Sequence, residues 1–173
     1  ILSRVIEATR YELAIGLTSV FLGVAIATAV GIISGYLGGV VDALIQRVVD
    51  AWLAFPGLIL LLIISAVLGP SPRTLIIALT IGVIPGTSRV IRGSVLSEKN
   101  NAYVEAARVI GASQARIMFR HIFPQVVAPL IVIISIMIPA IALLSAALSF
   151  LGLGLPPPPP SWGADLSGDA RAY

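Results

Sequence analysis

The chain has 173 residues, of which 58% are hydrophobic and 11% are charged. Soluble domains carry about a quarter charged residues, so this composition indicates a membrane protein. The formal net charge of +3 is too small to indicate binding to nucleic acid. The chain lacks cysteine, which excludes disulfides and thiolate chemistry, and its single histidine, His121, provides no metal cluster. We therefore expect neither a metal nor a cofactor.

Residues 1–38 predict one interfacial helix and one membrane span. Residues 1–12 are polar and amphipathic and favour a short helix at the membrane surface. Residues 13–38 carry no charge and are long enough to cross about 30 Å of hydrocarbon. Small residues recur in this span every fourth position, which favours a face for close helix packing over the general richness of membrane helices in Gly and Ala. They are Ser19, Gly23, Ala27, Gly31 and Gly35, with Gly39 following in register.

Three further spans are predicted, which makes the fold an all-α transmembrane bundle of about four spans. Residues 38–50 are a polar connection, and residues 52–68 form the second span, with Trp52 as an interfacial anchor. The third span, about 74–89, is short and interrupted by Gly82, Pro85 and Gly86. A broken helix that lines a watery path and a simple kink both fit this pattern. The fourth span covers about 126–151, and Pro139 is expected to bend it.

The polar loop 98–124 predicts two short helices. Asn100 or Asn101 can cap the first helix, with Glu105 in its first turn and Arg108 in its last, each at the end that its charge prefers. Gly111 is placed to end that helix. Ser113 can cap the second helix, which we expect to stop before Pro124.

The first loop helix carries an unusually smooth surface. Ala107 and Gly111 are four residues apart and share one face, and Ala106 lies beside them. A smooth helix flanked by charges suits docking into the groove of a partner protein, whereas a solvated loop helix gains nothing from it.

The end of the chain, 152–173, is rich in proline. Residues 156–160 are five consecutive prolines, which favour polyproline II. A ligand for an SH3-type domain is the alternative interpretation, and we disfavour it because this segment is expected to lie outside the cell.

Several of these motifs together resemble those of ABC importer permeases. Glu105-Ala106-Ala107, then Gly111 and Pro124, resembles the EAA loop of that family, and residues 150–154 with 160–163 resemble its Phe-Leu-Gly-Leu-Gly and Ser-Trp-Gly sequences. The resemblance is greatest to the peptide and nickel permeases. His121 and Phe123 depart from the family pattern, in the second loop helix only.

The resemblance implies a specific organisation. Residues 1–173 would be a single permease domain that lacks a span at each end, with 98–124 as the cytoplasmic EAA loop and 152–173 as an extracytoplasmic segment. It also implies a second, similar permease, two ATPase subunits docked on the loop, and an external solute-binding protein. The solute would be a dipeptide or oligopeptide, with nickel and glutathione as alternatives. The residues implied to couple to the ATPase are Tyr103, Glu105, Ala106, Ala107, Arg108, Gly111 and Pro124.

The distribution of basic residues predicts the orientation. With four spans, one side receives Arg47, Arg89, Arg92, Lys99, Arg108, Arg116 and Arg120, and the other receives Arg4, Arg10, Arg73 and Arg171. The positive-inside rule then puts the loop in the cytoplasm and both ends of this chain outside the prokaryotic inner membrane. Two of the loop arginines, Arg116 and Arg120, could contact lipid headgroups or the ATPase, and headgroups are favoured.

The sequence lacks the motifs by which a transport protein would itself use ATP or an ion gradient. Lys99 follows Glu98 rather than glycine, so no phosphate-binding loop is present, and the four predicted spans carry no Asp, Glu, Lys or His well inside them. There are no paired carboxylates or zinc motifs, and the chain is not expected to be an enzyme. Energy for active transport would enter through the loop helix. The alternative from another class is a passive channel or membrane scaffold that needs no ATPase.

Overall fold

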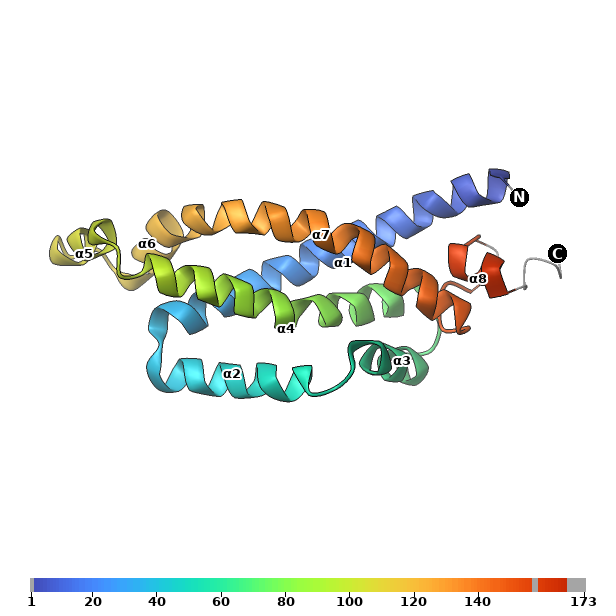
Figure 1. Ribbon diagram of the computed structural model, residues 1–173, viewed down its shortest axis with the longest axis horizontal. Helices are drawn as coiled ribbons and strands as arrows, with labels where there is room; N and C mark the ends of the chain where they lie inside the picture. Colours follow the sequence, from blue (N-terminus) through green and yellow to red (C-terminus); the bar gives the residue numbers. More distant parts are fainter. Residues whose placement is uncertain (1, 157–158, 168–173) are drawn as a thin grey trace. The chain divides into compact units, whose positions relative to one another are not determined.

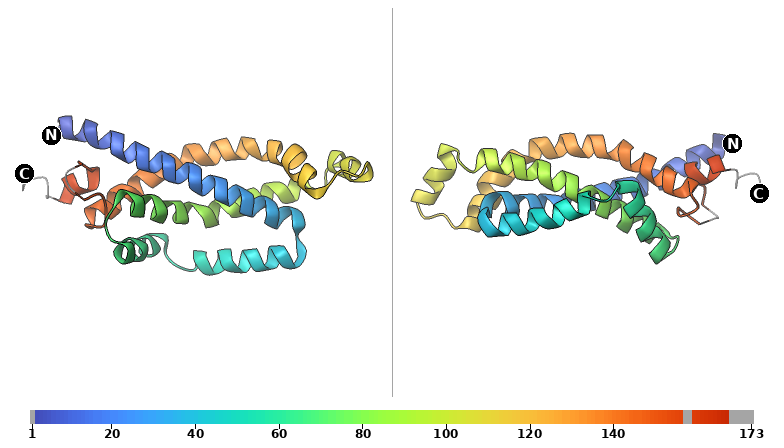
Figure 2. Two further views of the ribbon diagram at one scale, coloured as in Figure 1. Left: turned by 180° about the vertical axis from the view of Figure 1, so that it is seen from behind. Right: turned by 60° about the horizontal axis from the view of Figure 1, so that its bottom comes forward.

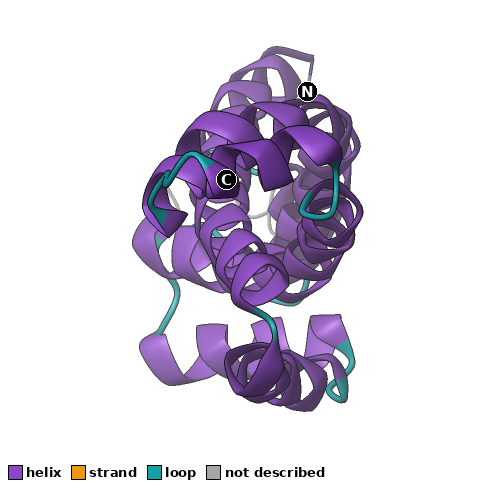
Figure 3. Ribbon diagram, turned by 90° about the vertical axis from the view of Figure 1, so that its left-hand side faces the viewer, coloured by secondary structure: helices purple, strands orange, loops and turns teal. Residues whose placement is uncertain are grey.

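The computed structural model describes residues 2–156 and 159–167, and these residues form helices joined by short loops, without a strand (Figures 1 and 3). Parts of the proline run and the last six residues, including Arg171, therefore lie outside the described residues. The all-α class is confirmed for the described part of the chain. The helices are α1 (Leu2–Leu37), α2 (Gly39–Leu53), α3 (Gly57–Leu68), α4 (Pro72–Glu98), α5 (Ala102–Val109), α6 (Gln114–Ile117), the π-helix η1 (Met118–Ile122), α7 (Phe123–Phe150) and α8 (Trp162–Ser167).

Within the described residues, three helical runs are long and apolar enough to cross a membrane. They are α1, α4 and the continuous run from Gln114 to Phe150. A fourth span results if α2 and α3 are counted as one bent span. The structure thus agrees with a transmembrane bundle of about four spans, although several predicted boundaries differ.

Helix α1 is longer than predicted. It runs unbroken over 36 residues (Figure 2), so the separate interfacial helix expected at residues 1–12 is wrong. That stretch contains neither glycine nor proline, so nothing in it ends a helix that the following span has already nucleated. At 1.5 Å per residue, α1 measures about 54 Å and exceeds the hydrocarbon thickness. It also contains Glu12, which is fully buried and directly precedes the predicted span 13–38.

The second predicted span is divided. The supposed polar connection 38–50 is most of the helix α2, and the chain then breaks at Pro56, which precedes α3. Proline disfavours the helical conformation at the preceding residue, here Phe55, so a helix cannot continue smoothly through this point. Helix α3 has 12 residues and is about 18 Å long, too short to cross the hydrocarbon alone.

The third predicted span is neither short nor interrupted. Helix α4 has 27 residues and contains Pro85 in its interior. The Ser88 hydroxyl donates to the Pro85 carbonyl oxygen at 2.9 Å, and Leu61 of α3 packs 3.3 Å from where a Cβ on Gly82 would lie. Packing of this kind outweighs the weak helix propensity of glycine and proline.

The described chain divides into two compact units. Unit 1 comprises Ile1–Gly23, Phe55–Val83 and Ser135–Tyr173, and unit 2 comprises Val24–Ala54 and Ile84–Ile134. In unit 1, α1 and α4 approach closely at Gly23, where a Cβ would lie 2.7 Å from Cβ of Val83. The Ser19 hydroxyl donates to the Ile76 carbonyl oxygen at 3.5 Å.

The α1–α4 approach within unit 2 has the same character. A Cβ on Gly31 would lie 2.7 Å from the Ser88 carbonyl oxygen, and one on Gly35 would lie 2.9 Å from Cβ of Val95. Ala27, also on α1, is fully buried. This is the face on which the sequence repeats its small residues, and only such residues let two helix backbones come so near. Gly39 does not continue the face, since α1 ends at Leu37.

Candidate functional site

The loop between α4 and α7 consists of α5, α6 and η1, all in unit 2 (Figure 1). Asn101 is the N-cap residue of α5, with an extended backbone, as predicted. Its side chain does not cap the helix, however; it donates to a Glu98 carboxylate oxygen at 2.7 Å. Asn101 therefore ties the start of α5 to the end of α4 instead.

Gly111 ends α5 through its backbone conformation. Its φ is +80°, and the amides of Gly111 and Ala112 donate to the carbonyl oxygens of Arg108 and Ala107, each at 3.0 Å. This is the Schellman pattern, which uses glycine because a Cβ is strained at positive φ. The predicted C′ role of Gly111 is confirmed. A Cβ there would meet no atom within 4 Å, so the constraint is conformational and not steric.

The second loop helix begins as predicted and ends differently. The Ser113 hydroxyl accepts from the Arg116 amide at 3.3 Å, which confirms the cap. The helix does not stop before Pro124, because α6 passes through the π-helix η1 directly into α7. Pro124 is the second residue of α7 and lies just after the π turn, inside the continuous helical run from Gln114 to Phe150. A single π turn is a feature often found at functional sites.

The two faces of α5 differ in exposure. Val104 and Ala107 are buried, whereas Glu105, Ala106 and Arg108 are exposed. The smooth face expected from Ala106, Ala107 and Gly111 is therefore only partly available, because Ala107 points into unit 2. The two residues that follow, Val109 and Ile110, expose 82% and 84% of their surface, and the sequence interpretation overlooked them. These two adjacent side chains form an exposed apolar surface at the end of α5.

Contacts from α5 reach three other elements of unit 2. The Tyr103 hydroxyl donates to the Glu98 carboxylate at 2.7 Å, and its ring centroid lies 6.4 Å from that of His121 in η1. The Arg108 guanidinium lies 5.6 Å from the ring centroid of Tyr36 in the last turn of α1, a cation–π geometry. The loop helix is thus held to the ends of α1 and α4 and to η1 by side chains.

The environment of Tyr103 also alters its acidity. Partial burial, together with the hydrogen bond and negative charge of Glu98, raises the pKa of the Tyr103 hydroxyl above its usual value. The phenol therefore stays protonated and able to donate over the whole physiological pH range.

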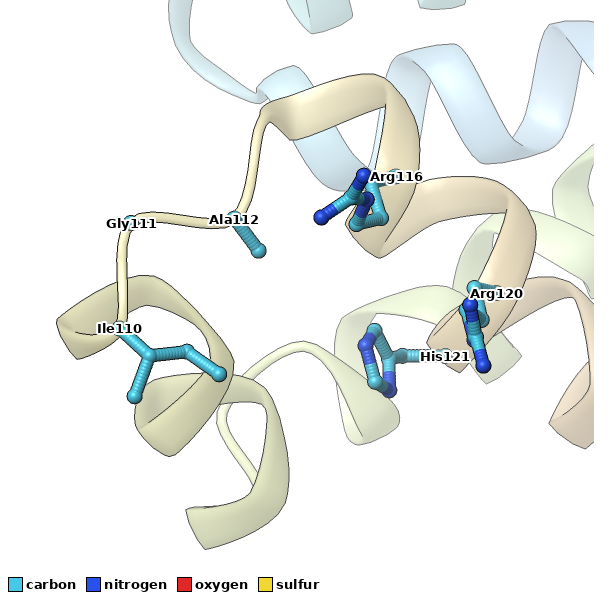
Figure 4. Close-up of a pocket in the computed structure, with 6 residues that line it drawn as sticks. All are labelled: Ile110, Gly111, Ala112, Arg116, Arg120 and His121. Atoms are coloured by element: carbon cyan, nitrogen blue, oxygen red, sulfur yellow. The ribbon is translucent and has the colours of Figure 1, made fainter.

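A basic pocket lies beside the Gly111 turn (Figure 4). Its volume is about 320 Å³, and it is lined by Ile110, Gly111, Ala112, Arg116, Arg120 and His121. Arg116 and Arg120 are exposed, and in the described part of the chain neither has an ion-pair partner. Two unpaired guanidinium groups at one pocket favour an anionic group there. Pro124 does not line this pocket.

Two ion pairs hold α2 to α4 in unit 2, and the sequence interpretation missed both. Arg92 donates to both carboxylate oxygens of Asp42, at 2.5 and 2.6 Å, and Arg89 pairs with Asp50. The Lys99 ammonium donates to the Gly35 carbonyl oxygen at 3.0 Å, which joins the ends of α4 and α1. The opposite charges at 42 and 92 are 50 residues apart, and no local pattern pairs them.

Known proteins resemble this chain in sequence and in fold. It is 41% identical to the glutathione transport system permease protein GsiD of Pectobacterium atrosepticum and 44% identical to that of Escherichia coli, each over 99% of this chain. The chain spans 57% and 56% of those two relatives, so it corresponds to about half of their length.

A chain in the solved structure of the inward-facing MetNI methionine ABC transporter shares the fold. The TM-score is 0.76 at 21% identity, over 87% of this chain and 76% of that chain. The family model for the binding-protein-dependent transport system inner membrane component matches residues 27–170. The chain therefore belongs to the family of inner membrane components of binding-protein-dependent transport systems.

Proposed function

We propose that this chain is the permease part of an ATP-driven importer and that α5 with its Gly111 turn docks on a separate ATPase subunit. The observation that carries the proposal is the exposed end of α5, where Glu105, Ala106, Arg108, Val109 and Ile110 face outward. A docking helix needs such a surface together with firm attachment to the spans, and Tyr103 and Arg108 provide that attachment.

Motion of the docked ATPase would reach the spans through these attachments. A force on α5 acts on α1 through the Arg108–Tyr36 contact and on α4 through the Tyr103–Glu98 hydrogen bond. Rigid helices held by discrete contacts are the usual means by which a local displacement becomes a movement between two arrangements. ATP binding and hydrolysis would then alternate the access of a solute path to the two sides.

The basic pocket extends the docking surface. It shares Ile110 and Gly111 with the end of α5, and its two exposed arginines are available to pair with an anionic group. We place a carboxylate of the ATPase there in preference to a lipid headgroup, because the pocket adjoins the docking turn. The concentration of basic residues in the loop supports its cytoplasmic location by the positive-inside rule, and the remaining partners would be a second permease and an external solute-binding protein.

The proposed solute is a short peptide. The relatives in Pectobacterium atrosepticum and Escherichia coli are named as glutathione permeases, and they cover almost all of this chain. Among the solutes that the sequence left open, these names favour glutathione over nickel or a dipeptide.

Substitution of Gly111 tests the docking. In the full-length permease co-expressed with its ATPase, Gly111→Arg is expected to abolish uptake and ATPase co-purification while membrane insertion persists. The change strains a positive φ and places a bulky cation on the docking turn. Gly39→Arg is the matched control, since Gly39 also has a positive φ of +54° and open space around its Cβ position but lies outside the loop.

The control should retain the ATPase and most of the uptake. Normal uptake and normal co-purification in the Gly111 variant would contradict docking at this turn. Failure of the unaltered permease to retain any ATPase would favour a passive channel or scaffold.

A further inference from the structure

The helix α2 of unit 2 presents a row of apolar side chains outward and polar side chains inward. Val40, Leu44 and Val48 follow one another along one face and expose 75%, 60% and 63% of their surface. Asp42 and Gln46 lie on the opposite face of the helix, where both are half-buried. A helix on a water-exposed surface has the reverse arrangement, so α2 suits a surrounding of lipid.

Apolar packing contributes little to the attachment of α2. Among the residues of this helix, all of which the structure describes, only Val49 is buried. Lipid tails are as apolar as a leucine side chain, so apolar surface gains almost nothing when it moves from lipid to a neighbouring helix. The attachment of α2 to the rest of unit 2 therefore depends mainly on polar contacts.

The Asp42 carboxylate joins α2 to two other helices. It accepts from the Arg92 guanidinium of α4 at 2.5 and 2.6 Å and from the Ser34 hydroxyl of α1 at 2.5 Å. Ser34 is fully buried, and its hydroxyl accepts in turn from the Gln46 amide of α2 at 3.0 Å. One side chain of α2 thus binds α1 and α4 together.

The second ion pair between α2 and α4 is far more exposed. The side chains of Asp50 and Arg89 are 58% and 46% exposed, against 15% and 29% for Asp42 and Arg92. Ion pairs open to solvent contribute little because water and salt screen them, whereas a shielded pair with further hydrogen bonds is costly to break. Asp42 therefore carries the contact whose loss would release α2.

The helix ends that hold Asp42 also hold the loop helix α5. On α1, Ser34 lies in the same helical turn as Tyr36, which contacts α5. On α4, Arg92 lies about two turns before Glu98, whose carboxylate binds α5. Helices α2 and α5 are thus attached to the same two helix ends.

We propose that Asp42 is a positioning residue for transport, which fixes α2 to the helix ends that carry α5. This role rests on the proposed docking of α5 on an ATPase. A displacement of α5 then reaches α2 through rigid helices and the contacts of Asp42. Without the carboxylate the docking surface is unchanged and ATP hydrolysis continues, but α2 no longer follows the displacement.

Spin labelling tests the attachment of α2 without reference to transport. The chain has no cysteine, so Leu44→Cys on α2 and Val90→Cys on α4 place two labels at exposed positions of unit 2. In the assembled transporter, Asp42→Ala is expected to broaden the distribution of distances between the labels. Asp50→Ala, the matched control on the same helix, should leave the distribution unchanged. Equal widths in the two variants would overturn the attachment.

The ratio of solute uptake to ATP hydrolysis in the reconstituted transporter tests the role in transport. With the binding protein present, Asp42→Ala is expected to lower uptake of labelled glutathione at least about tenfold, while ATP hydrolysis and retention of the ATPase stay within about twofold. Arg92→Ala should have the same effect, and the double variant should be no worse than either single variant, because the two side chains act as one unit. Asp50→Ala should retain both uptake and hydrolysis.

Three results would contradict this role. Unchanged uptake in the Asp42 variant would overturn the proposal. A parallel loss of uptake, hydrolysis and ATPase retention would also overturn it, since it would assign the ion pair to stability alone. Absence of ATP-driven uptake in the unaltered transporter would instead contradict the proposed function, and with it any role of Asp42 in transport.

Discussion

Tyr103 joins three elements of unit 2 at one side chain. Its hydroxyl donates to Glu98 at the end of α4, its ring contacts His121 in η1, and it belongs to α5 itself. Ionisation of the phenol would place a negative oxygen against the Glu98 carboxylate and would end the hydrogen bond. The connection of the loop to α4 therefore depends on a protonated tyrosine.

The first prediction concerns the acidity of Tyr103. Its pKa is raised in the folded chain, so the neutral form contributes stability that is present below the unfolded value of 10.0 and is lost as the pH rises through the folded value. Glu98→Gln removes the charge and should move the Tyr103 transition toward 10. Tyrosinate absorbance across an alkaline titration measures this, with Tyr103→Phe identifying the transition. An unchanged titration in the Glu98 variant would contradict the assignment.

At the scale of elements, the approach of α1 to α4 is set by glycines. Within unit 2, the position of a Cβ on Gly31 lies 2.7 Å from a backbone oxygen and 2.8 Å from Cβ of Ile91. The oxygen belongs to the backbone of α4, and Cβ of Ile91 is bonded directly to that backbone. Neither atom can therefore move without displacing α4. The same helix also carries Gly16, whose Cβ position meets nothing within 4 Å.

The second prediction uses this pair of glycines. Gly31→Val is expected to force α1 and α4 apart and to destabilise the protein by about 1–3 kcal/mol, the usual cost of overpacking. Gly16→Val, the control on the same helix, should change the free energy of unfolding little. Denaturant unfolding of the purified permease in detergent compares the two. Equal stability of both variants would show that the α1–α4 approach contributes nothing.

At the scale of the whole molecule, the chain belongs to a transport family and carries a proposed docking surface for an ATPase. The activity to measure is therefore solute uptake driven by ATP. The relatives that are 41% and 44% identical are named for glutathione transport, and this chain corresponds to only about half of each.

The third prediction is that the complete transporter accumulates labelled glutathione in an ATP-dependent manner. Excess unlabelled glutathione should reduce the accumulation of labelled glutathione, whereas nickel should not reduce it. Accumulation of nickel, or accumulation that persists without ATP hydrolysis, would contradict it.

Some features of the loop depend on local chemistry alone, and the sequence was sufficient for them. Gly111 ends α5 because only glycine accepts its φ of +80° without strain, and Ser113 caps α6 because its hydroxyl reaches an amide three residues ahead. Sequence reasoning failed at Pro124, where a π turn joins two helices that were expected to separate. It also failed at Ala107, since helical spacing identifies a shared face but not which way that face points.

The sequence by itself determined the membrane class, the helical fold, the two-helix loop and the family resemblance, because apolar length, capping residues and short motifs act over a few neighbouring positions. The tertiary structure alone decided the continuation of α4 through Gly82 and Pro85 and the Asp42–Arg92 pair. It also decided the burial of Glu12. These features depend on contacts between residues tens of positions apart, and the energy of such contacts is not contained in any local pattern.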